Sequence, residues 1–211
     1  MSILNFLHSG GNKVSLTTPT SNPSSNITFK LPDADGTAGQ VLQTDGNGNL
    51  TFVNPGGISF SQQWRLTSNK STSSTTSDIS ANLEVVDSDG YGGLGGTMTQ
   101  SSGIFTFPST GIYLIMAKGS YSASSSSTSN YNEMDLHTTT DGSSFNRAAI
   151  GWCYIASGGY GTAACDFMFD VTNTSTHKVK FRAASASSNA YLTANSNDNQ
   201  THFTFIRLGD T

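Results

Sequence analysis

The residue types best suited to bind a metal ion lie in the run Glu133-x-Asp135-x-His137. Because side chains alternate along a strand, these two carboxylates and the imidazole would share one strand face. Such a set could coordinate a divalent cation. The competing interpretation, which we favour, is a solvated strand face with Met134 and Leu136 turned toward the core. We therefore predict no metal ion and no cofactor.

The acidic turns of the chain imitate metal loops, but their spacing predicts turns. The run Asp45-Gly-Asn-Gly-Asn49 begins like a calcium loop, yet the sixth position is Leu50 instead of Gly and the twelfth is Gly56 instead of Glu. Such a loop cannot close around an ion as an EF-hand does. We predict a hairpin turn here, since Asp-Gly and Asn-Gly tolerate positive φ. We also predict a turn at 87–90, with calcium binding as the alternative.

Nucleophilic catalysis has little support in the sequence. It contains no Gly-x-Ser-x-Gly elbow, no His-Glu-x-x-His run and no phosphate-binding loop. Cys153 with His137 or His177 would supply a nucleophile and a base, but their spacing does not favour a pair. We expect Cys153 and Cys165 to be small buried residues, with a disulfide as the alternative. A zinc site is not indicated, because neither belongs to a Cys-x-x-Cys pair. We predict that the protein is not an enzyme.

Carbohydrate chemistry leaves two further alternatives open. A glycan-degrading enzyme would need paired carboxylates in a cleft; the chain has two glutamates, Glu84 and Glu133, although aspartates could substitute. A glycan-binding surface would use aromatic platforms with polar neighbours. The aromatic candidates are Trp64, Trp152, Tyr154 and Tyr160. We favour the competing interpretation, in which both tryptophans lie in the core or at an interface.

The composition excludes several classes of protein. Of the 211 residues only 11% are charged, against about 25% in an average soluble domain. The net charge is −4 and the ten Lys and Arg residues are scattered, so we predict no nucleic-acid partner. No apolar run approaches the ~20 residues that span a bilayer, so we predict no membrane contact. Residues 1–8 lack the basic start and long apolar centre of a secretory signal.

The alternation of apolar and polar residues predicts an all-β sandwich of eight to ten strands. Residues 1–57 contain few apolar residues and cannot build a core of their own, so this region needs partners. Residues 58–211 form the second region, after a linker at 54–57. The predicted strands are 26–32, 40–44, 49–53, 62–66, 103–107, 112–121, 131–139, 145–155, 163–171, 179–186 and 201–208. We expect 103–107 to pair with 112–121, and 163–171 with 179–186; 68–80 is predicted to be an exposed loop.

The strand predicted at 112–121 is apolar on both faces. Ile112, Leu114 and Met116 share one face, while Tyr113 and Ile115 share the other. A core can cover one of these faces, and a neighbouring subunit would cover the other. The pattern therefore favours an oligomer.

Two motifs of the second region resemble those of the C1q/TNF-like jelly rolls. The first is Gly103-x-Phe-x-x-Pro-x-x-Gly-x-Tyr113, and the second is the closing aromatic strand 203–208, which has Thr204 where those families usually carry Gly. The resemblance covers 58–211 and implies a jelly-roll head that forms a homotrimer. The candidate trimer-interface residues are Tyr113, Ile115, Phe203 and Phe205. His202 would be either a proton switch near the threefold axis or a polar strand residue.

The segment Leu31-Pro-Asp-Ala-Asp-Gly-Thr-Ala-Gly-Gln-Val-Leu-Gln-Thr-Asp-Gly-Asn-Gly-Asn-Leu50 resembles a segment recurrent in bacteriophage fibre and virion proteins. The two resemblances together imply a trimeric phage structural protein, made in the host cytoplasm and exposed on the virion. Residues 1–57 would bind other virion proteins of capsid or tail. The head would be a short fibre or receptor-binding tip with a host surface glycan or protein as partner, contacted through loops at 68–80, 122–130 and 156–162. The alternative is a capsid decoration protein at threefold positions, and an alternative of another class is a glycan-degrading tail-spike enzyme.

Overall fold

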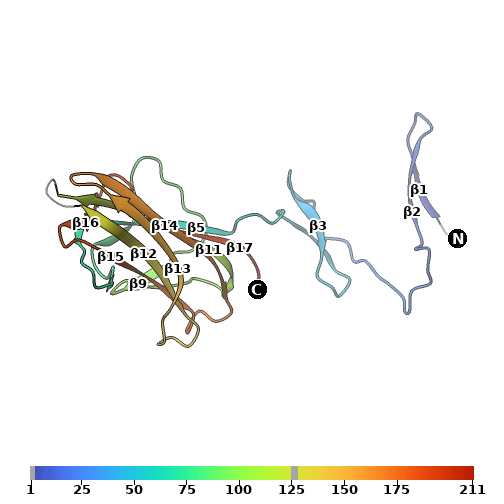
Figure 1. The fold of residues 1–211 in the computed structure, drawn as a ribbon. Coiled ribbons are helices and arrows are strands. Elements are labelled where there is room, and N and C mark those ends of the chain that lie inside the picture. The colour runs from blue at the N-terminus through green and yellow to red at the C-terminus, as the bar shows by residue number, and fades with distance from the viewer. Residues whose placement is uncertain (1–2, 125–127) are drawn as a thin grey trace. The chain divides into compact units, whose positions relative to one another are not determined.

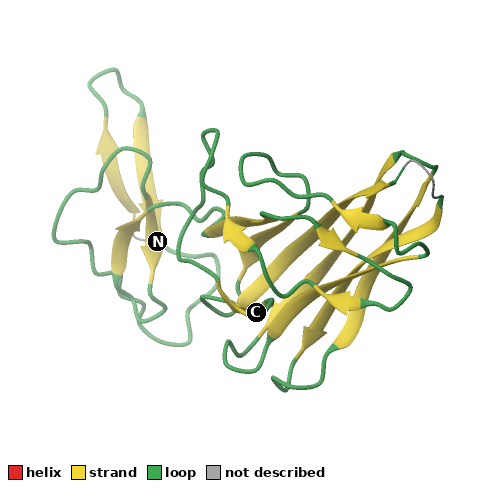
Figure 2. Cartoon of the chain, turned by 90° about the vertical axis from the view of Figure 1, so that its left-hand side faces the viewer, coloured by secondary structure: helices red, strands yellow, loops and turns green. Residues whose placement is uncertain are grey.

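A computed structural model describes residues 3–124 and 128–211 of the chain. The described residues form strands, turns and loops without a helix, so the protein is all-β as predicted (Figure 2). The chain divides into two compact units, Met1–Gly56 and Gly57–Thr211.

The first unit begins with a hairpin that the sequence did not lead us to expect. Strand β1 (Ile3–Leu7) pairs antiparallel with β2 (Lys13–Thr17). Leu4 lies opposite Leu16 and Phe6 lies opposite Val14. All four side chains are more than half exposed. One face of this hairpin is therefore apolar and uncovered within the chain.

A second hairpin joins β3 (Val41–Thr44) to β4 (Leu50–Val53) across the predicted turn. The strand predicted at 26–32 is wrong, because only a single parallel bridge forms there, between Lys30 and Asn49. The Lys30 N–H donates to the Gly48 carbonyl at 2.8 Å, and the Leu50 N–H donates to the Lys30 carbonyl at 2.9 Å. Large apolar side chains remain exposed in this part of the chain, namely Ile27, Phe29, Leu31, Val41, Leu42 and Phe52.

The second unit, the head, is a sandwich of two sheets (Figure 1). The first sheet has the strand order β13-β12-β15-β10-β9, and β7 also pairs with β15. Its strands are β7 (Ser77–Asp78), β9 (Thr99–Ser101), β10 (Ile104–Thr106), β12 (Ser129–Thr139), β13 (Asn146–Ile155) and β15 (Lys178–Ser185). The predicted hairpin between 131–139 and 145–155 is present as β12 and β13.

The second sheet has the strand order β6-β16-β11-β17-β5-β8, and β14 pairs with the long strand β11. Its strands are β5 (Phe60–Leu66), β6 (Lys70–Ser71), β8 (Leu83–Val85), β11 (Gly111–Ala123), β14 (Tyr160–Val171), β16 (Ala190–Leu192) and β17 (His202–Gly209). The stretch predicted to be a loop at 68–80 contains the two short strands β6 and β7.

Two pairings predicted from the sequence are wrong. Strand β10 pairs with β9 and β15 in the first sheet, whereas β11 lies in the second sheet. Strand β14 pairs with β11, and β15 pairs with β12 and β10, so β14 and β15 also lie in different sheets. The turns at 108–110 and 172–177 therefore cross between the sheets. Such crossings are typical of a Greek-key jelly roll, in which strands adjacent in sequence need not pair.

The core lies between the two sheets and is rich in aromatic rings. Phe105 of β10 is fully buried and contacts Trp64, Phe181 and Phe205 at ring-centroid distances of 5.3, 5.6 and 5.3 Å. Phe181 stacks on Phe203 at 3.9 Å. These contacts join strands from both sheets, and aromatic pairs of this kind add about 0.5–1.5 kcal/mol each beyond the area they bury.

Gly111 begins β11 where a side chain would not fit. Its φ is +141°, and a Cβ there would lie 2.4 Å from Nε of Arg207 and 2.6 Å from the Gly209 carbonyl oxygen. The glycine predicted at this turn is therefore required both by its backbone conformation and by the close approach of β17.

Candidate functional site

The four predicted interface residues lie in the core of the chain's own head. Tyr113, Ile115, Phe203 and Phe205 are each 0% exposed. Tyr113 packs against Phe60 and Phe107, and its hydroxyl donates to the Ser109 carbonyl at 3.0 Å. The prediction that these side chains face a neighbouring subunit is therefore wrong. The two-faced pattern of β11 was correct, but the face that carries Tyr113 turns inward, where the rings of Phe60 and Phe107 lie against it.

The face of β11 that points away from the core carries the other apolar set. Leu114 lies opposite Met168 of β14 on one side and opposite Ile206 of β17 on the other. Ile112 and Met116 flank Leu114 along the same face, and Met168 is 64% exposed. We call Ile112, Leu114, Met116, Met168 and Ile206 the outer apolar surface. These five side chains form a contiguous aliphatic and methionine-rich patch across three strands.

The four aromatic candidates for glycan binding divide into one core residue and three surface residues. Trp64 is buried, as expected, and its ring N–H donates to Oε1 of Gln62 at 3.1 Å. Trp152 and Tyr154 of β13 are each 62% exposed, and Tyr160 of β14 is 81% exposed. The expectation was that each tryptophan lies in the core or at an interface; Trp64 lies in the core, whereas Trp152 does not. Its placement at an interface stays a prediction.

The three polar residues of β12 are more buried than a solvated face would be. Asp135 is 1% exposed and His137 is 8% exposed, so the expectation of a solvated strand face is wrong for these two residues. Met134 and Leu136 point into the core, as expected. His137 Nε2 lies 3.4 Å from Asp135 Oδ2. Burial, and then the nearby Glu133 carboxylate, raise the pKa of Asp135. Burial also lowers the pKa of His137, although the Asp135 carboxylate opposes this effect.

The neighbours of this pair do not form a metal centre. Arg147 Nη1 lies 3.7 Å from Asp135 Oδ2, and the Glu133 carboxylate accepts a hydrogen bond from the Thr76 hydroxyl at 2.7 Å. Within the described residues, no three His, Cys, Asp or Glu side chains gather closely enough to hold a metal ion. The Asp135 and His137 pair is therefore a buried polar contact on the outside of β12.

The two cysteines are free thiols in different surroundings. Burial raises the pKa of the Cys165 thiol to about 12, and its S–H donates to the Met134 carbonyl at 3.3 Å. Burial also raises the pKa of Cys153. A raised pKa disfavours the thiolate, which is the nucleophilic form. Neither cysteine is activated for the nucleophilic chemistry considered above.

The acidic turns use their carboxylates internally. The Asp45 carboxylate accepts hydrogen bonds from the Asn47 N–H at 2.8 Å and from the Asn49 side-chain amide at 2.6 Å. These contacts lower the pKa of Asp45. The turn interpretation at this position fits the geometry, because the groups that would bind a cation already close the turn.

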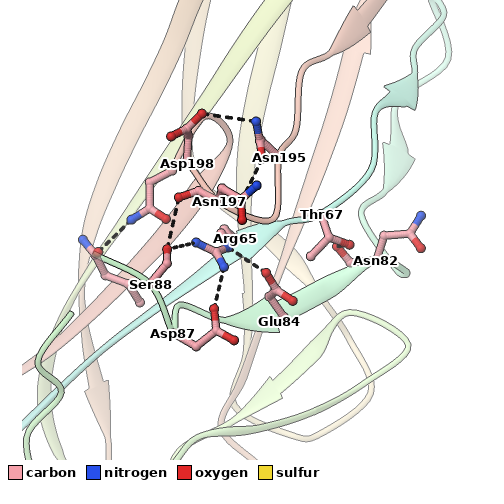
Figure 3. Close-up of polar contacts among 11 residues, drawn as sticks. Arg65, Thr67, Asn82, Glu84, Asp87, Ser88, Asn195, Asn197 and Asp198 are labelled. Carbon is pink, nitrogen blue, oxygen red and sulfur yellow. Dashed lines mark hydrogen bonds and ion pairs between the residues drawn. The ribbon is translucent and has the colours of Figure 1, made fainter. Parts of the chain in front are cut away.

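A buried arginine that the sequence analysis missed organises the edge of the second sheet (Figure 3). The Arg65 side chain is 1% exposed; its Nε lies 2.7 Å from Glu84 Oε1 and its Nη2 lies 2.6 Å from Asp87 Oδ1. Its Nη1 donates to the Ser88 hydroxyl at 2.8 Å, and that hydroxyl donates to the Asn197 carbonyl at 3.1 Å. This Arg65 network joins β5, the segment after β8 and the loop before β17. No spacing in the sequence would have indicated it.

His202 begins β17 next to this loop. Its Nδ1 lies 3.1 Å from the Asn199 carbonyl oxygen, and Lys118 lies opposite it on β11. Burial, chiefly, lowers the pKa of His202. The histidine is thus a partly buried strand residue of the head. Its position relative to a threefold axis stays a prediction.

The loops predicted to contact a ligand are described only in part. Residues 125–127 of the 122–130 loop lie outside the described residues. The loop predicted at 156–162 is shorter in the structure, because β14 begins at Tyr160. Within 3–124 and 128–211 the structure holds no helix capable of crossing a membrane.

Comparison with solved structures identifies the fold of the head. Murine APRIL at pH 5.0 aligns with a TM-score of 0.53 and 12% identity, covering 71% of this chain and 98% of that one. The head is a TNF-like jelly roll. Eiger TNF from S. frugiperda aligns with a TM-score of 0.48 and 12% identity, covering 72% of this chain and 94% of that one. The vertex protein P5 of PRD1 aligns with a TM-score of 0.47 and 15% identity, covering 73% of this chain and 100% of that one.

These likenesses concern the fold, since each falls well below 25% identity. No protein-family model matches the sequence, and no curated protein matches it. The predicted C1q/TNF-like jelly roll is confirmed for the head. Function has to be argued from the surfaces described above.

Proposed function

We propose that this chain is a non-enzymatic structural protein of a bacteriophage virion. It acts as a homotrimer whose jelly-roll head is exposed on the particle as a short fibre or receptor-binding tip. The first unit attaches the head to other virion proteins. The single observation that carries the proposal is the outer apolar surface on the second sheet of the head.

The outer apolar surface supports self-association. Its side chains are partly exposed, Met168 most of all, and they lie side by side across three strands, which favours contact with another protein surface. Three copies placed around a threefold axis would bury this face and leave no open edge for further growth, because a ring of such contacts closes on itself. The outer apolar surface lies on the face of β11 opposite to Tyr113 and Ile115, the two residues of this strand that were first expected at the interface.

The first unit supports attachment to a partner. The face of the β1–β2 hairpin that carries Leu4, Phe6, Val14 and Leu16 is uncovered within the chain. An isolated two-stranded hairpin is marginally stable in water, so this face needs another protein to cover it. The resemblance of residues 31–50 to segments of phage fibre proteins favours a virion protein as that partner.

The chemistry of the head supports a non-enzymatic role. The thiols of Cys153 and Cys165 have raised pKa values, and the buried Asp135 carboxylate lies 3.7 Å from Arg147 Nη1. The Glu133 carboxylate is engaged by Thr76. These groups hold the sandwich together and are poorly placed to act on a glycan.

Electron microscopy of particles labelled with an antibody against residues 58–211 tests this function. Label at the tail supports a fibre or tip, whereas label distributed over the shell overturns the tip and favours decoration of the capsid. Particles of the source phage that carry no label, together with free protein in the lysate, would overturn the virion role altogether.

A further inference from the structure

An open pocket of about 390 Å³, here called the cavity, lies on the second sheet of the head, where β11 ends and β14 begins. Its lining includes Ser120, Tyr160, Thr162, Thr193 and Gln200. Ser120 lies directly opposite Thr162 in the β11–β14 pairing, and Tyr160 lies at the first position of β14. The cavity thus collects hydroxyl groups, one amide and one aromatic ring.

The cavity lies at the end of the head away from the point where the chain enters it. The chain enters the head at β5, whose first residue, Phe60, pairs with Arg207, and Arg207 in turn pairs with Tyr113 near the start of β11. Ser120 lies seven positions further along β11, which is about 23 Å at ~3.3 Å per residue. The cavity is therefore well separated along β11 from the point where the chain enters the head.

Part of the lining is fixed and part is free to bind. The Ser120 hydroxyl donates to the Gln200 carbonyl at 3.0 Å, and the Thr193 hydroxyl donates to the Ser120 carbonyl at 3.2 Å. These bonds hold the frame of the cavity. The side chains of Tyr160, Thr162 and Gln200 have no hydrogen-bond partner among the described residues, and the Tyr160 ring is 81% exposed. Three polar groups therefore remain available to an incoming molecule.

The chemistry of the lining selects a neutral, hydroxyl-rich ligand. No Lys, Arg, Asp or Glu lines the cavity, so a phosphate or an acidic group would find no counter-charge there. Hydroxyl and amide groups can both donate and accept, which suits the hydroxyls of a sugar. An exposed tyrosine ring offers a flat apolar surface to the C–H face of a pyranose while its hydroxyl stays polar. The volume falls near the lower end of the ~300–1,000 Å³ range of ligand pockets.

We propose that this cavity binds one or two sugar units of a neutral glycan. The proposal rests on the proposed function for the source of that glycan, a host surface. Tyr160 stacks on the sugar ring, and Thr162 and Gln200 hydrogen-bond its hydroxyls. Trp152 is nearly as exposed as Tyr160 but does not line the cavity, so it provides a matched control.

Saturation-transfer NMR on the full chain tests the proposal. The probes are glucose, galactose, mannose, N-acetylglucosamine, maltose and lactose, each titrated through the millimolar range. We expect saturable transfer from at least one of them, with a Kd that rises about tenfold in Tyr160→Ala and severalfold in Gln200→Ala. Trp152→Ala should bind as the unmodified chain does. Because the Tyr160 ring is exposed, its removal leaves the fold intact.

Two results would overturn the proposal: none of these sugars binds saturably, or binding is lost in Trp152→Ala and retained in Tyr160→Ala. The mass of each sample, from sedimentation, separates this proposal from the proposed function. If the protein is a trimer but binds none of the sugars, the sugar-binding proposal is refuted and the proposed function is not. If the protein is a monomer that binds sugar through Tyr160, the proposed trimer is refuted and the sugar-binding proposal stands.

Discussion

Leu114 on β11 lies directly opposite Met168 on β14, and both side chains point away from the core of the head. Ile206 continues the row on the other side of Leu114. The same strand sends Tyr113 and Ile115 into the core. One strand therefore supplies both the interior of the sandwich and the apolar surface on which the proposed assembly depends.

The Arg65 network should contribute strongly to the stability of the head. Removing one partner of a buried ion pair costs about 3–5 kcal/mol when the other charge stays buried. In Arg65→Met the carboxylates of Glu84 and Asp87 can still reach water, so we expect a loss of about 3 kcal/mol in the free energy of unfolding. Urea denaturation at fixed protein concentration measures it.

The two carboxylate partners of Arg65 provide an internal comparison. The side chain of Glu84 is 34% exposed, whereas that of Asp87 is 76% exposed. A more buried partner is screened less by water, so Glu84→Gln should destabilise the head more than Asp87→Asn. Equal losses for these two variants would contradict the ranking, and no loss in Arg65→Met would show that the network does not stabilise the head.

Gly151 should not tolerate a side chain. A Cβ at this position on β13 would lie 2.0 Å from the Ala164 carbonyl oxygen of β14. Backbone must move to relieve this contact, so Gly151→Ala should cost about 1–3 kcal/mol. The control is Gly92→Ala, because a Cβ at Gly92 meets nothing within 4 Å. Thermal unfolding of both variants tests the prediction, and a Gly151→Ala melting temperature equal to that of Gly92→Ala would contradict it.

The stability of the head should depend on the protonation of His202. Burial lowers its pKa below the ordinary value of 6.5, so near pH 6 the unfolded chain binds more protons at this position than the folded chain. The free energy of unfolding should therefore fall as the pH drops below about 6.5. Lys118, opposite His202, acts in the same direction.

His202→Gln removes this contribution. The free energy of unfolding of this variant should therefore decline less steeply than that of the unmodified chain between about pH 7 and pH 5. The slope will not vanish, because the pKa of His137 is also lowered. Denaturant titrations at several pH values measure both slopes. A slope in His202→Gln as steep as that of the unmodified chain would contradict the prediction.

Much of the fold was predictable because the strand pattern is strong. The alternation around Tyr113 and the Asp-Gly turn at residue 45 both depend on local preferences that hold whatever the chain packs against. The pairing of β10 with β15 was not predictable from local pattern, since a jelly roll places neighbours in sequence on opposite sheets.

The candidate site was harder to predict, for a related reason. Sequence shows that β11 is apolar on both faces, but it does not show which face the other sheet covers. The rings of Phe107 and Phe60 lie against Tyr113, and this contact leaves Leu114 outside. Arg65 reads as an ordinary polar strand residue, because its partners Glu84 and Asp87 are brought to it by folding alone.

The central claim is that the outer apolar surface joins three copies of the chain. Sedimentation equilibrium of the unmodified protein tests it most directly, and we predict a species of three times the 22.2 kDa chain mass. Leu114→Glu and Met168→Glu should each shift this species toward monomer, because each places a charge in the buried surface. Thr99→Glu, on β9 of the opposite sheet, is the exposed control and should remain trimeric. A monomeric unmodified chain, or trimers that persist unchanged in both surface variants, would contradict the account.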